Sequence, residues 1–519
     1  MKRNLKFNKV RPKVKLLARN DKFILFSFFL LNCFMRVSSI NKEIHPWLFC
    51  DEKIFSDQVT RLLGSNSVIS SEFRAGGFNI YPSYLLIKIC NLITSHNLSL
   101  NAQLIISRIL LNVILNSASC IFIYLSARIL FKCTKAAMFG ALLFTCSPGI
   151  LSQSRIWYPD SYLIFFSAGI LYFLLKILEN KTSKSDIILL STFAALAVSV
   201  KYTSLFLLLP ITLVLFYSRR RTPLKNFFRL DLIRFFILFG LSTVIINFSI
   251  LFHPHGFKNA FIWNIQNYGH SLGVHFSGIS FYLITGFITY FTVAIFPVVF
   301  FGLKAFARIK STSGLLIMVT PLAYLLYMGM ANLVVIRNVN LVLPYILIFF
   351  VAGFLEIVRS FSRNMSALIL GIILVSQIWQ GILIIKNDLK VDSRELANTW
   401  IVKNLDHGIT LGLNKGCSEN YQITKKPNST IYDSDLSQRL KYYLLDSRWN
   451  SPLSKYYTRK GLLLENDFVN LHYYYFNNPK LFPSSGNKSS LRVFIPKEYK
   501  LMKVFNGYGP EVVLIVRKD

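Results

Sequence analysis

The sequence predicts an all-α polytopic membrane domain of about eleven transmembrane helices, followed by a small α/β domain outside the membrane. Of the 519 residues, 53% are hydrophobic and only 16% are charged, and the mean hydropathy is +0.45. No water-soluble chain of this size needs so much apolar surface. The apolar residues also come in long runs, so whole segments can face lipid. Only the last quarter of the chain changes character.

The basic excess indicates orientation rather than a nucleic-acid partner. The formal net charge is +34, from 58 Lys and Arg against 24 Asp and Glu. A soluble protein with this charge would be expected to bind nucleic acid. In a membrane protein, basic residues collect in cytoplasmic loops and lie against anionic headgroups, so we expect no nucleic acid. The seven scattered cysteines form no CxxC and predict neither a zinc site nor a disulfide framework.

The N-terminal elements are a tail, a helix and a loop. Residues 1–22 form a basic tail that we place in the cytoplasm. Residues 23–40 read as a retained transmembrane helix rather than a signal peptide, because no small-x-small cleavage pattern follows them. Residues 41–80 form a polar outer loop. Residues 81–94 are apolar but too short to span, so we expect them in the membrane interface.

Ten further spans complete the predicted membrane domain, which covers residues 23–386. They lie near residues 103–131, 136–153, 160–178, 187–200, 203–217, 232–252, 279–303, 314–331, 341–358 and 367–385. An N-in start makes every second loop cytoplasmic, and all five of those loops are basic. The odd number of spans places residues 387–519 on the outer, extracytoplasmic side, in a multi-pass protein of the plasma (inner) membrane.

Residues 387–519 predict the small α/β domain. They carry charges of both signs and turn signals such as NLDHG, KKPNS and PSSGN. Short alternating runs such as SLRVFIP and EVVLIV are typical of strands.

Two adjacent acids, Asp51 and Glu52, stand in the outer loop about ten residues after the first helix. A carboxylate at the membrane surface can act as a general base towards an acceptor hydroxyl, or it can be an ordinary solvated loop acid. The string DEKIFSDQVTRLL that follows predicts an amphipathic helix, and we expect it to lie flat on the membrane with the carboxylates at its start.

Three cations and an acid mark the starts and ends of later spans. Arg155 and Asp160 flank Tyr158-Pro159 at the start of one span, where they either have a functional task or merely snorkel and cap the helix. Lys201 interrupts two apolar runs and either binds a lipid phosphate or snorkels. Arg337, next to Asn338, precedes another span, and an arginine fork there suits a phosphate.

A histidine-containing outer loop follows one of the later spans. His270 belongs to a group with His253, His255 and His275, but their spacing fits no strong zinc pattern. No DxD motif surrounds Asp51 either. We therefore expect no cofactor, and a divalent metal is not indicated.

The candidate residues share one predicted face. The topology maps six of them to the outer side: Asp51, Arg155, Asp160, Lys201, His270 and Arg337. Carboxylates and cations at one membrane surface suit a transferase whose donor is an anionic lipid phosphate and whose acceptor is a hydroxyl. The cations would offset the charge that develops on the leaving phosphate, and a carboxylate would take the acceptor proton.

These strings resemble the GT-C superfamily of membrane glycosyltransferases, in the branch of protein O-mannosyltransferases and bacterial aminoarabinose transferases. The matching strings are Asp51-Glu52 followed by YPSYL, SP....SR...PD at 147–160, KYT.L...P at 201–210, GHSLG at 269–273, R......P at 337–344, and D.R..A..WI..N...G at 392–408. The resemblance spans roughly residues 23–408. Beyond about residue 407 the chain matches no family pattern, and it lacks the three-part MIR-like domain of eukaryotic mannosyltransferases.

The resemblance implies inverting, single-displacement transfer from a polyprenyl-phosphate-linked sugar. It implies that Asp51 is the base, that Glu52 helps to bind the acceptor and that Asp160 is a second outer carboxylate. We expect the substrate to contact Arg155, Lys201, His270 and Arg337. The three cations are expected there on account of their position. The acceptor would be a glycolipid, a polysaccharide or a protein. The alternatives are a flippase or transporter of lipid-linked sugars, which more often shows internal repeats and midplane charges, and a lipid-binding scaffold without catalysis.

Overall fold

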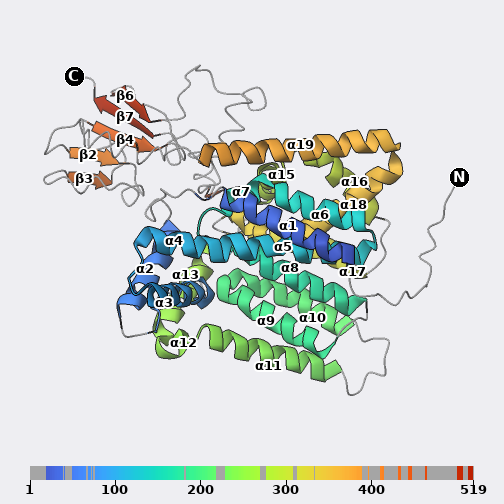
Figure 1. Ribbon diagram of the computed structural model, residues 1–519, viewed down its shortest axis with the longest axis horizontal. Helices are drawn as coiled ribbons and strands as arrows, with labels where there is room; N and C mark the ends of the chain where they lie inside the picture. The colour runs from blue at the N-terminus through green and yellow to red at the C-terminus, as the bar shows by residue number, and fades with distance from the viewer. Residues whose placement is uncertain are drawn as a thin grey trace.

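The computed structural model describes residues 19–388, together with residue 396 and the strands of the C-terminal region. Within 19–388 it leaves out residues 39, 41–49, 66–67, 72, 74–75, 180–182, 218–227, 269–275, 308–311 and 332–333. The predicted tail 1–22 therefore lies mostly outside the described residues, as do the first part of the outer loop and His270. Most of the long helices run side by side along one direction and form a bundle (Figure 1).

The centre of the bundle is built from helices that match predicted spans. Helix α8 (Pro159–Leu178) packs on α5 (Asn116–Phe131) on one side and on α9 (Lys184–Val200) on the other. Helix α1 (Arg19–Val37) packs on α5, and α18 (Leu343–Ser360) packs on α16 (Phe296–Phe306). Helix α8 is the most buried of the long apolar helices: 78% of its most apolar 18-residue stretch is buried inside the protein. Its ends are therefore fixed by neighbours on several sides.

The predicted span at 103–131 is one continuous helical rod from Leu100 to Phe131. It consists of α4 (Leu100–Ser107), the π-helical segment η3 (Arg108–Leu115) and α5. A π-helical turn widens the spiral locally and occurs frequently at functional sites.

Two predictions of a single straight span are wrong, and a third needs refinement. The span at 136–153 is broken at Ser147, which is extended, into α6 (Thr134–Cys146) and α7 (Pro148–Gln153). The span at 279–303 is bent by 104° at Thr292, which has a φ of 59°. The span at 203–217 opens as a 3-10 helix, η4 (Tyr202–Leu207), before α10 (Leu208–Tyr217). Pro148 cannot donate a backbone hydrogen bond, which favours the first break.

The bent region and the second half of the bundle contain the remaining helices. Their bounds are α11 (Phe228–Ile246), α12 (Ser249–Phe252), α13 (Pro254–Tyr268), α14 (Phe276–Ser280), η5 (Phe281–Gly286), α15 (Phe287–Phe291), η6 (Val293–Ile295), α17 (Thr312–Gly329), η7 (Ile336–Leu341) and α19 (Arg363–Asp388).

The chain is a multi-pass membrane protein by the length and composition of its helices. Among the described residues, five helices are long and apolar enough to cross a membrane, and the bent pair would make a sixth. These five are Leu100–Phe131, Pro159–Leu178, Thr312–Gly329, Leu343–Ser360 and Arg363–Lys386. Helices such as Thr134–Cys146 and Tyr202–Phe216 are apolar but shorter. The total of eleven spans stays a prediction.

Two helices from the outer-loop region gather at one end of the bundle. Helix α2 (Cys50–Gly64) is amphipathic as predicted, but its apolar face, with Phe55, Val59 and Leu62, is buried in the protein core. That face contacts Trp157, at 5.8 Å between the centroids of Phe55 and Trp157, and this corrects the expectation that it rests on lipid. Helix α3 (Tyr81–Thr94) is seen nearly end-on in Figure 1, so it runs across the bundle.

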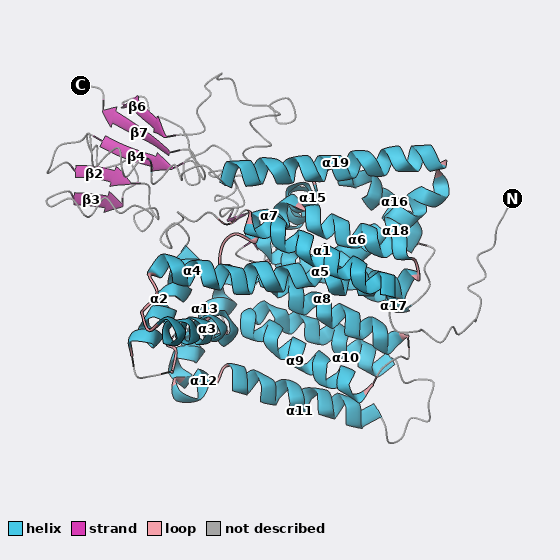
Figure 2. Cartoon of the chain, viewed as in Figure 1, coloured by secondary structure: helices cyan, strands magenta, loops and turns pink. Residues whose placement is uncertain are grey.

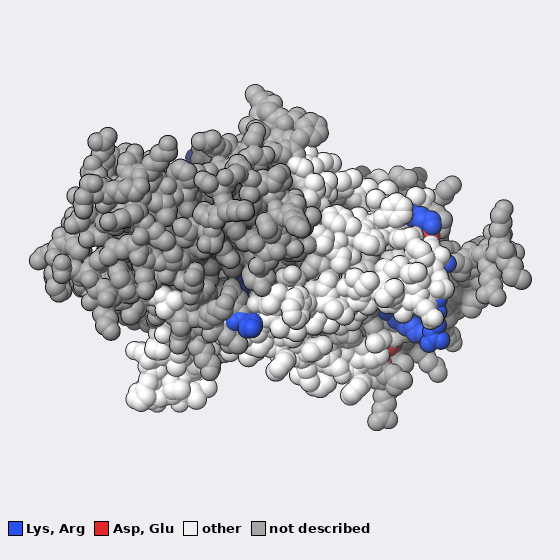
Figure 3. Space-filling view, turned by 90° about the horizontal axis from the view of Figure 1, so that it is seen from above, with Lys and Arg blue, Asp and Glu red and all other residues white. Residues whose placement is uncertain are grey.

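The opposite end of the bundle is basic. In Figure 3 most of the visible Lys and Arg side chains of the described residues gather at the right-hand end. Figure 1 shares its horizontal axis with that view, and there the helices α2, α3 and α13 lie at the left-hand end. This segregation agrees with the predicted charge bias of the loops. The direction of the chain in a membrane stays a prediction.

The C-terminal region contains a five-stranded mixed sheet, drawn in magenta in Figure 2. The strands are ordered β3 (Thr430–Asp433), β2 (Thr410–Leu413), β4 (Tyr442–Asp446), β7 (Val512–Arg517) and β6 (Tyr499–Phe505). Strand β2 is parallel to β3 and β4, whereas β7 is antiparallel to β4 and β6. A second, two-stranded sheet pairs β1 (Val334–Val335) with β5 (Leu462–Leu463) in parallel. The predicted strand EVVLIV corresponds to β7, while SLRVFIP lies outside the described residues, and the α part of the predicted domain stays a prediction.

Candidate active site

Asp160 lies in the first turn of α8 and forms ion pairs with two cations. Proline at the start of this helix suits its first turn, because the missing N–H has no intrahelical acceptor there. The Asp160 side chain is buried, and its carboxylate lies 2.7 Å from the Nζ of Lys201 and 3.3 Å from the Nε of Arg337. Asp160 therefore does more than cap a helix.

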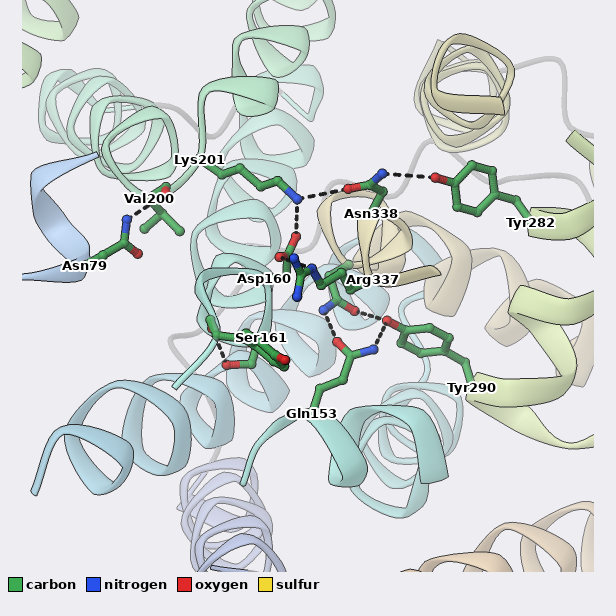
Figure 4. A network of polar contacts seen from close by, with 12 residues as sticks. Asn79, Gln153, Asp160, Ser161, Val200, Lys201, Tyr282, Tyr290, Arg337 and Asn338 are labelled. Atoms are coloured by element: carbon green, nitrogen blue, oxygen red, sulfur yellow. Dashed lines mark hydrogen bonds and ion pairs between the residues drawn. The ribbon is translucent and has the colours of Figure 1, made fainter. Parts of the chain in front are cut away.

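Lys201 reaches this carboxylate because α9 ends immediately before it. The residue is the C-cap of α9 and has an extended backbone, so the chain changes direction and the side chain points towards α8. Its Nζ also donates to the Oδ1 of Asn338 at 2.9 Å, and the Nδ2 of Asn338 donates to the hydroxyl of Tyr282 at 3.0 Å (Figure 4). Only 13% of the lysine side chain is exposed. The interpretation of Lys201 as a snorkelling residue is therefore wrong.

Arg337 lies on the other side of the carboxylate, in η7. Its guanidinium carbon is 4.7 Å from the centroid of the Tyr158 ring, a cation–π distance. Arg155 is also buried, in the turn between α7 and α8, and so it does not snorkel to a membrane surface either. Figure 4 shows that Asp160, Lys201 and Arg337 point towards one another from α8, the end of α9 and η7.

A ring of three neutral side chains lies next to this group. The Nε2 of Gln153 donates to the Tyr290 hydroxyl at 2.6 Å, and that hydroxyl donates to the Oδ1 of Asn340 at 2.5 Å. The Nδ2 of Asn340 closes the ring by donating to the Oε1 of Gln153. The ring links α7, α15 and η7, so it fixes the segment that carries Arg337.

Glu52 is the second buried carboxylate of the region. Arg108 binds it with two donors, Nε to Oε1 at 2.6 Å and Nη2 to Oε2 at 2.7 Å, and the backbone N–H of Trp157 donates to Oε1 at 3.1 Å. Such bidentate pairs combine strength with fixed geometry. The contacts join α2 to the segment that opens α8, so Glu52 acts in the fold as a brace, and its expected role in acceptor binding stays a prediction.

The position of Asp51 follows from that brace. Asp51 precedes Glu52 in the first turn of α2, and its side chain lies outside the described residues. Because Glu52 contacts Trp157, three residues before Asp160, the backbone of Asp51 is brought into the same region. The assignment of Asp51 as a base stays a prediction.

Polar residues of the Leu100–Phe131 rod form hydrogen bonds with the turn between α7 and α8 and with the start of α8. The Nδ2 of Asn112 donates to the carbonyl of Ile156, and the Nδ2 of Asn116 donates to the carbonyl of Ser161 at 2.6 Å. Arg36 of α1 donates from Nε to the Oδ1 of Asn116 at 3.0 Å. The turn that carries Arg155 and Asp160 is thus held by buried amides.

Sequence reasoning identified part of this site and missed the rest. Asp160, Lys201 and Arg337 are brought together, Glu52 is tied to the turn before Asp160 through Trp157, and Arg155 is buried in that turn, whereas His270 lies outside the described residues. Arg108 was missed, although an ionisable residue inside a predicted span is itself a signal of function. The neutral partners Gln153, Tyr290 and Asn340 carry no comparable signal, because such residues are common in any chain.

The charge balance of the described site favours an anionic ligand. Two cations, Lys201 and Arg337, share the single carboxylate of Asp160, whereas Glu52 is matched by Arg108, so the group around Asp160 has one more cation than carboxylate among its described side chains. Buried cations that are already oriented can stabilise charge developing on a leaving group without reorganisation.

Comparisons with known proteins agree with the predicted resemblance. The family described as dolichyl-phosphate-mannose-protein mannosyltransferase matches residues 89–246. No curated protein sequence matches the chain.

Several solved glycosyltransferases share the fold. The archaeal oligosaccharyltransferase AglB from Archaeoglobus fulgidus, in complex with an inhibitory peptide and a dolichol-phosphate, superposes with a TM-score of 0.54 at 11% identity, over 85% of this chain and 71% of that one. ArnT from Cupriavidus metallidurans bound to undecaprenyl phosphate gives 0.53 at 11% identity, over 96% of this chain and 98% of that one. The predicted resemblance to GT-C membrane glycosyltransferases is confirmed.

Proposed function

We propose that this protein transfers a sugar from a polyprenyl-phosphate-linked donor to a hydroxyl acceptor at the outer face of the plasma membrane, with inversion at the anomeric carbon. The observation that carries the proposal is the buried Asp160 carboxylate between Lys201 and Arg337, braced to α2 through the contact of Glu52 with Trp157. The GT-C fold and the carriers bound by ArnT and AglB support a lipid-phosphate donor.

In the proposed reaction the acceptor oxygen attacks the anomeric carbon. The bond between that carbon and the phosphate oxygen breaks, and the polyprenyl phosphate leaves with both bonding electrons. Asp51 takes the proton of the acceptor hydroxyl. Lys201 and Arg337 stabilise the charge on the departing phosphate, and Asp160 holds both cations in place.

The acceptor is a glycolipid, a polysaccharide or a protein. A transfer assay with each class identifies which of them is used. The alternative of a flippase or transporter gains no support from the comparisons, because the two superposed proteins named above are glycosyltransferases.

The decisive experiment incubates the purified protein, reconstituted in sealed proteoliposomes, with undecaprenyl phosphate carrying a radiolabelled hexose and with each acceptor class. We expect free undecaprenyl phosphate and a labelled product. Movement of the intact donor across the membrane without cleavage would instead establish a transporter. Absence of both, with every acceptor and several hexoses, would overturn the proposed function.

Asp51→Asn tests the proposed base. We expect it to fold normally and to lose transfer almost completely, because the amide cannot accept the proton. Asp57→Asn is a matched control, because Asp57 lies on the same helix and is exposed. Full transfer by Asp51→Asn would refute the role of Asp51 as the base.

A further inference from the structure

Asn79 is a buried amide at the end of the outer-loop region. It is the last residue of η2 (Gly77–Asn79) and has no exposed side-chain surface. Its Nδ2 donates to the carbonyl of Val200 at 2.8 Å and to the carbonyl of Gly76 at 2.8 Å. Its Oδ1 accepts a hydrogen bond from the hydroxyl of Tyr162. Both amide hydrogens of Asn79 are therefore used.

The partners of Asn79 lie beside the two members of the central ion pair. Val200 immediately precedes Lys201, and Tyr162 follows Asp160 by two residues in α8. Figure 4 shows Asn79 reaching the backbone of Val200 on the opposite side of α9 from the lysine head group. One side chain thus links the end of α9 to the first turn of α8, the two places from which Lys201 and Asp160 extend.

The end of a helix explains why this link matters. The last carbonyls of a helix have no intrahelical partner, and Val200 is the final residue of α9. The amide of Asn79 satisfies its carbonyl in a buried setting where water does not replace it. Without that partner the backbone at Val200 and Lys201 would have to move to find another donor.

The close fit of the neighbouring chain holds Asn79 in place. A Cβ at Gly76 would meet the carbonyl oxygen of Ser199 at 2.1 Å, so only glycine allows this approach of the backbones. The N–H of Gly77 donates to the Oδ1 of Asn247 at 2.7 Å. The outer-loop region is therefore anchored against the end of α9 before the chain enters α3.

We infer that Asn79 is a positioning residue that holds Lys201 against Asp160 and so orients the lysine ammonium towards the phosphate of a lipid-linked donor. The inference rests on the proposed function for the identity of the ligand. The link between Asn79 and the ion pair rests on the geometry alone.

The test measures binding of undecaprenyl phosphate to the full chain in nanodiscs. We expect Asn79→Leu to weaken binding about tenfold, because one misplaced charge-assisted contact is worth about that factor. In a Lys201→Met background the same substitution should cause no further loss, since Asn79 acts through the lysine. Equal losses in the two backgrounds would overturn the inference.

Two tyrosine variants separate positioning from general stability. Tyr162→Phe removes the hydroxyl that binds Asn79, and we expect about threefold weaker binding, with no further loss in the Lys201→Met background. Tyr124→Phe removes an equally buried hydroxyl, which donates to Asp21 at 2.8 Å elsewhere in the chain, and should leave binding unchanged. Equal weakening by both variants would contradict a positioning role, and this comparison stands even if Asn79→Leu does not fold.

A melting-temperature cycle keeps this inference separate from the proposed function. If the wild-type protein does not bind undecaprenyl phosphate, the proposed donor is wrong. The melting temperatures of Asn79→Leu, Lys201→Met and the double variant then decide the link by themselves. We expect the double variant to lose clearly less than the sum of the single losses, and additive losses would refute the link.

Discussion

The two helices α8 and α9 carry a lysine–aspartate pair at each end of their contact. At the site, Lys201 lies 2.7 Å from Asp160, and at the other end Lys176 lies 2.6 Å from Asp186. The carboxylates are equally buried, at 4% and 5% exposed, and the lysines differ modestly, at 13% and 23%. By distance and burial alone, the two pairs are nearly the same interaction.

Their remaining partners differ. Asp186 otherwise bonds to Ser183 at the start of its own helix, where the two residues form a capping box. Asp160 and Lys201 bind Arg337 and Asn338, which come from a segment more than a hundred residues further along the chain. The Lys176–Asp186 pair therefore joins two helices, whereas the Lys201–Asp160 pair joins three elements. The origin of the additional partners distinguishes the pair that we propose to be functional from the pair that only joins two helices.

The largest expected difference comes from neutralising each aspartate. Asp160→Asn should destabilise the protein by about 3–5 kcal/mol, because it removes a carboxylate shared by two largely buried cations, and should lower transfer at least about a hundredfold. Asp186→Asn should cost about 1–3 kcal/mol, because it removes the charged partner of Lys176 and alters the capping box, and should leave transfer intact. Thermal unfolding and the transfer assay measure both effects. Similar losses of transfer in the two variants would remove the distinction between the pairs.

Replacing each lysine tests the same difference between the two ion pairs, and we expect smaller effects than for the aspartates. Lys201→Met should lower transfer about tenfold to a hundredfold, because Arg337 still offsets part of the phosphate charge. Lys176→Met should change transfer little, since its ammonium is partly exposed and contacts a helix cap. Steady-state rates at several donor concentrations check this, and an intact rate in Lys201→Met would exclude the lysine from the reaction.

We expect the hydrogen bonds that hold the start of α8 to affect transfer less than the Lys201–Asp160 pair does. Asn116→Leu removes both the hydrogen bond to the carbonyl of Ser161 and the acceptor of Arg36, at a cost of about 1–3 kcal/mol. We expect a severalfold loss of transfer from the altered start of α8. Ser119→Ala is the control, because that hydroxyl bonds only within its own helix, to the carbonyl of Leu115. Undiminished transfer in a destabilised Asn116→Leu would show that the turn tolerates movement.

The smallest effect is expected at the capping box. Ser183→Ala removes the hydroxyl that accepts from the N–H of Asp186, and should cost about 1 kcal/mol without any change in transfer. A melting curve together with the transfer rate measures this. A loss of transfer here would mean that the two ends of α8 and α9 are coupled.

The class of protein and much of the helix pattern follow from the amino-acid sequence. Apolar runs longer than a bilayer requires can be read without an alignment, and α8, α18 and the Leu100–Phe131 rod lie where those runs predict them. The charged residues that interrupt or begin such runs also stand out, because charge is costly there. Asp160, Lys201 and Arg337 were therefore identifiable one by one.

Which of these residues meet, and which neighbours support them, depends on how the helices pack. The break at Ser147 and the bend at Thr292 lie inside apolar runs, so hydropathy alone does not reveal them. Glu52 became a brace because Arg108 lies 56 residues away in sequence yet 2.6 Å away in space. The side-chain amides of Asn79, Gln153 and Asn340 become structurally important only because they are buried. Burial removes water, so their N–H groups must find acceptors within the protein. Hydropathy is a property of each segment, whereas polar pairing is a property of the folded chain.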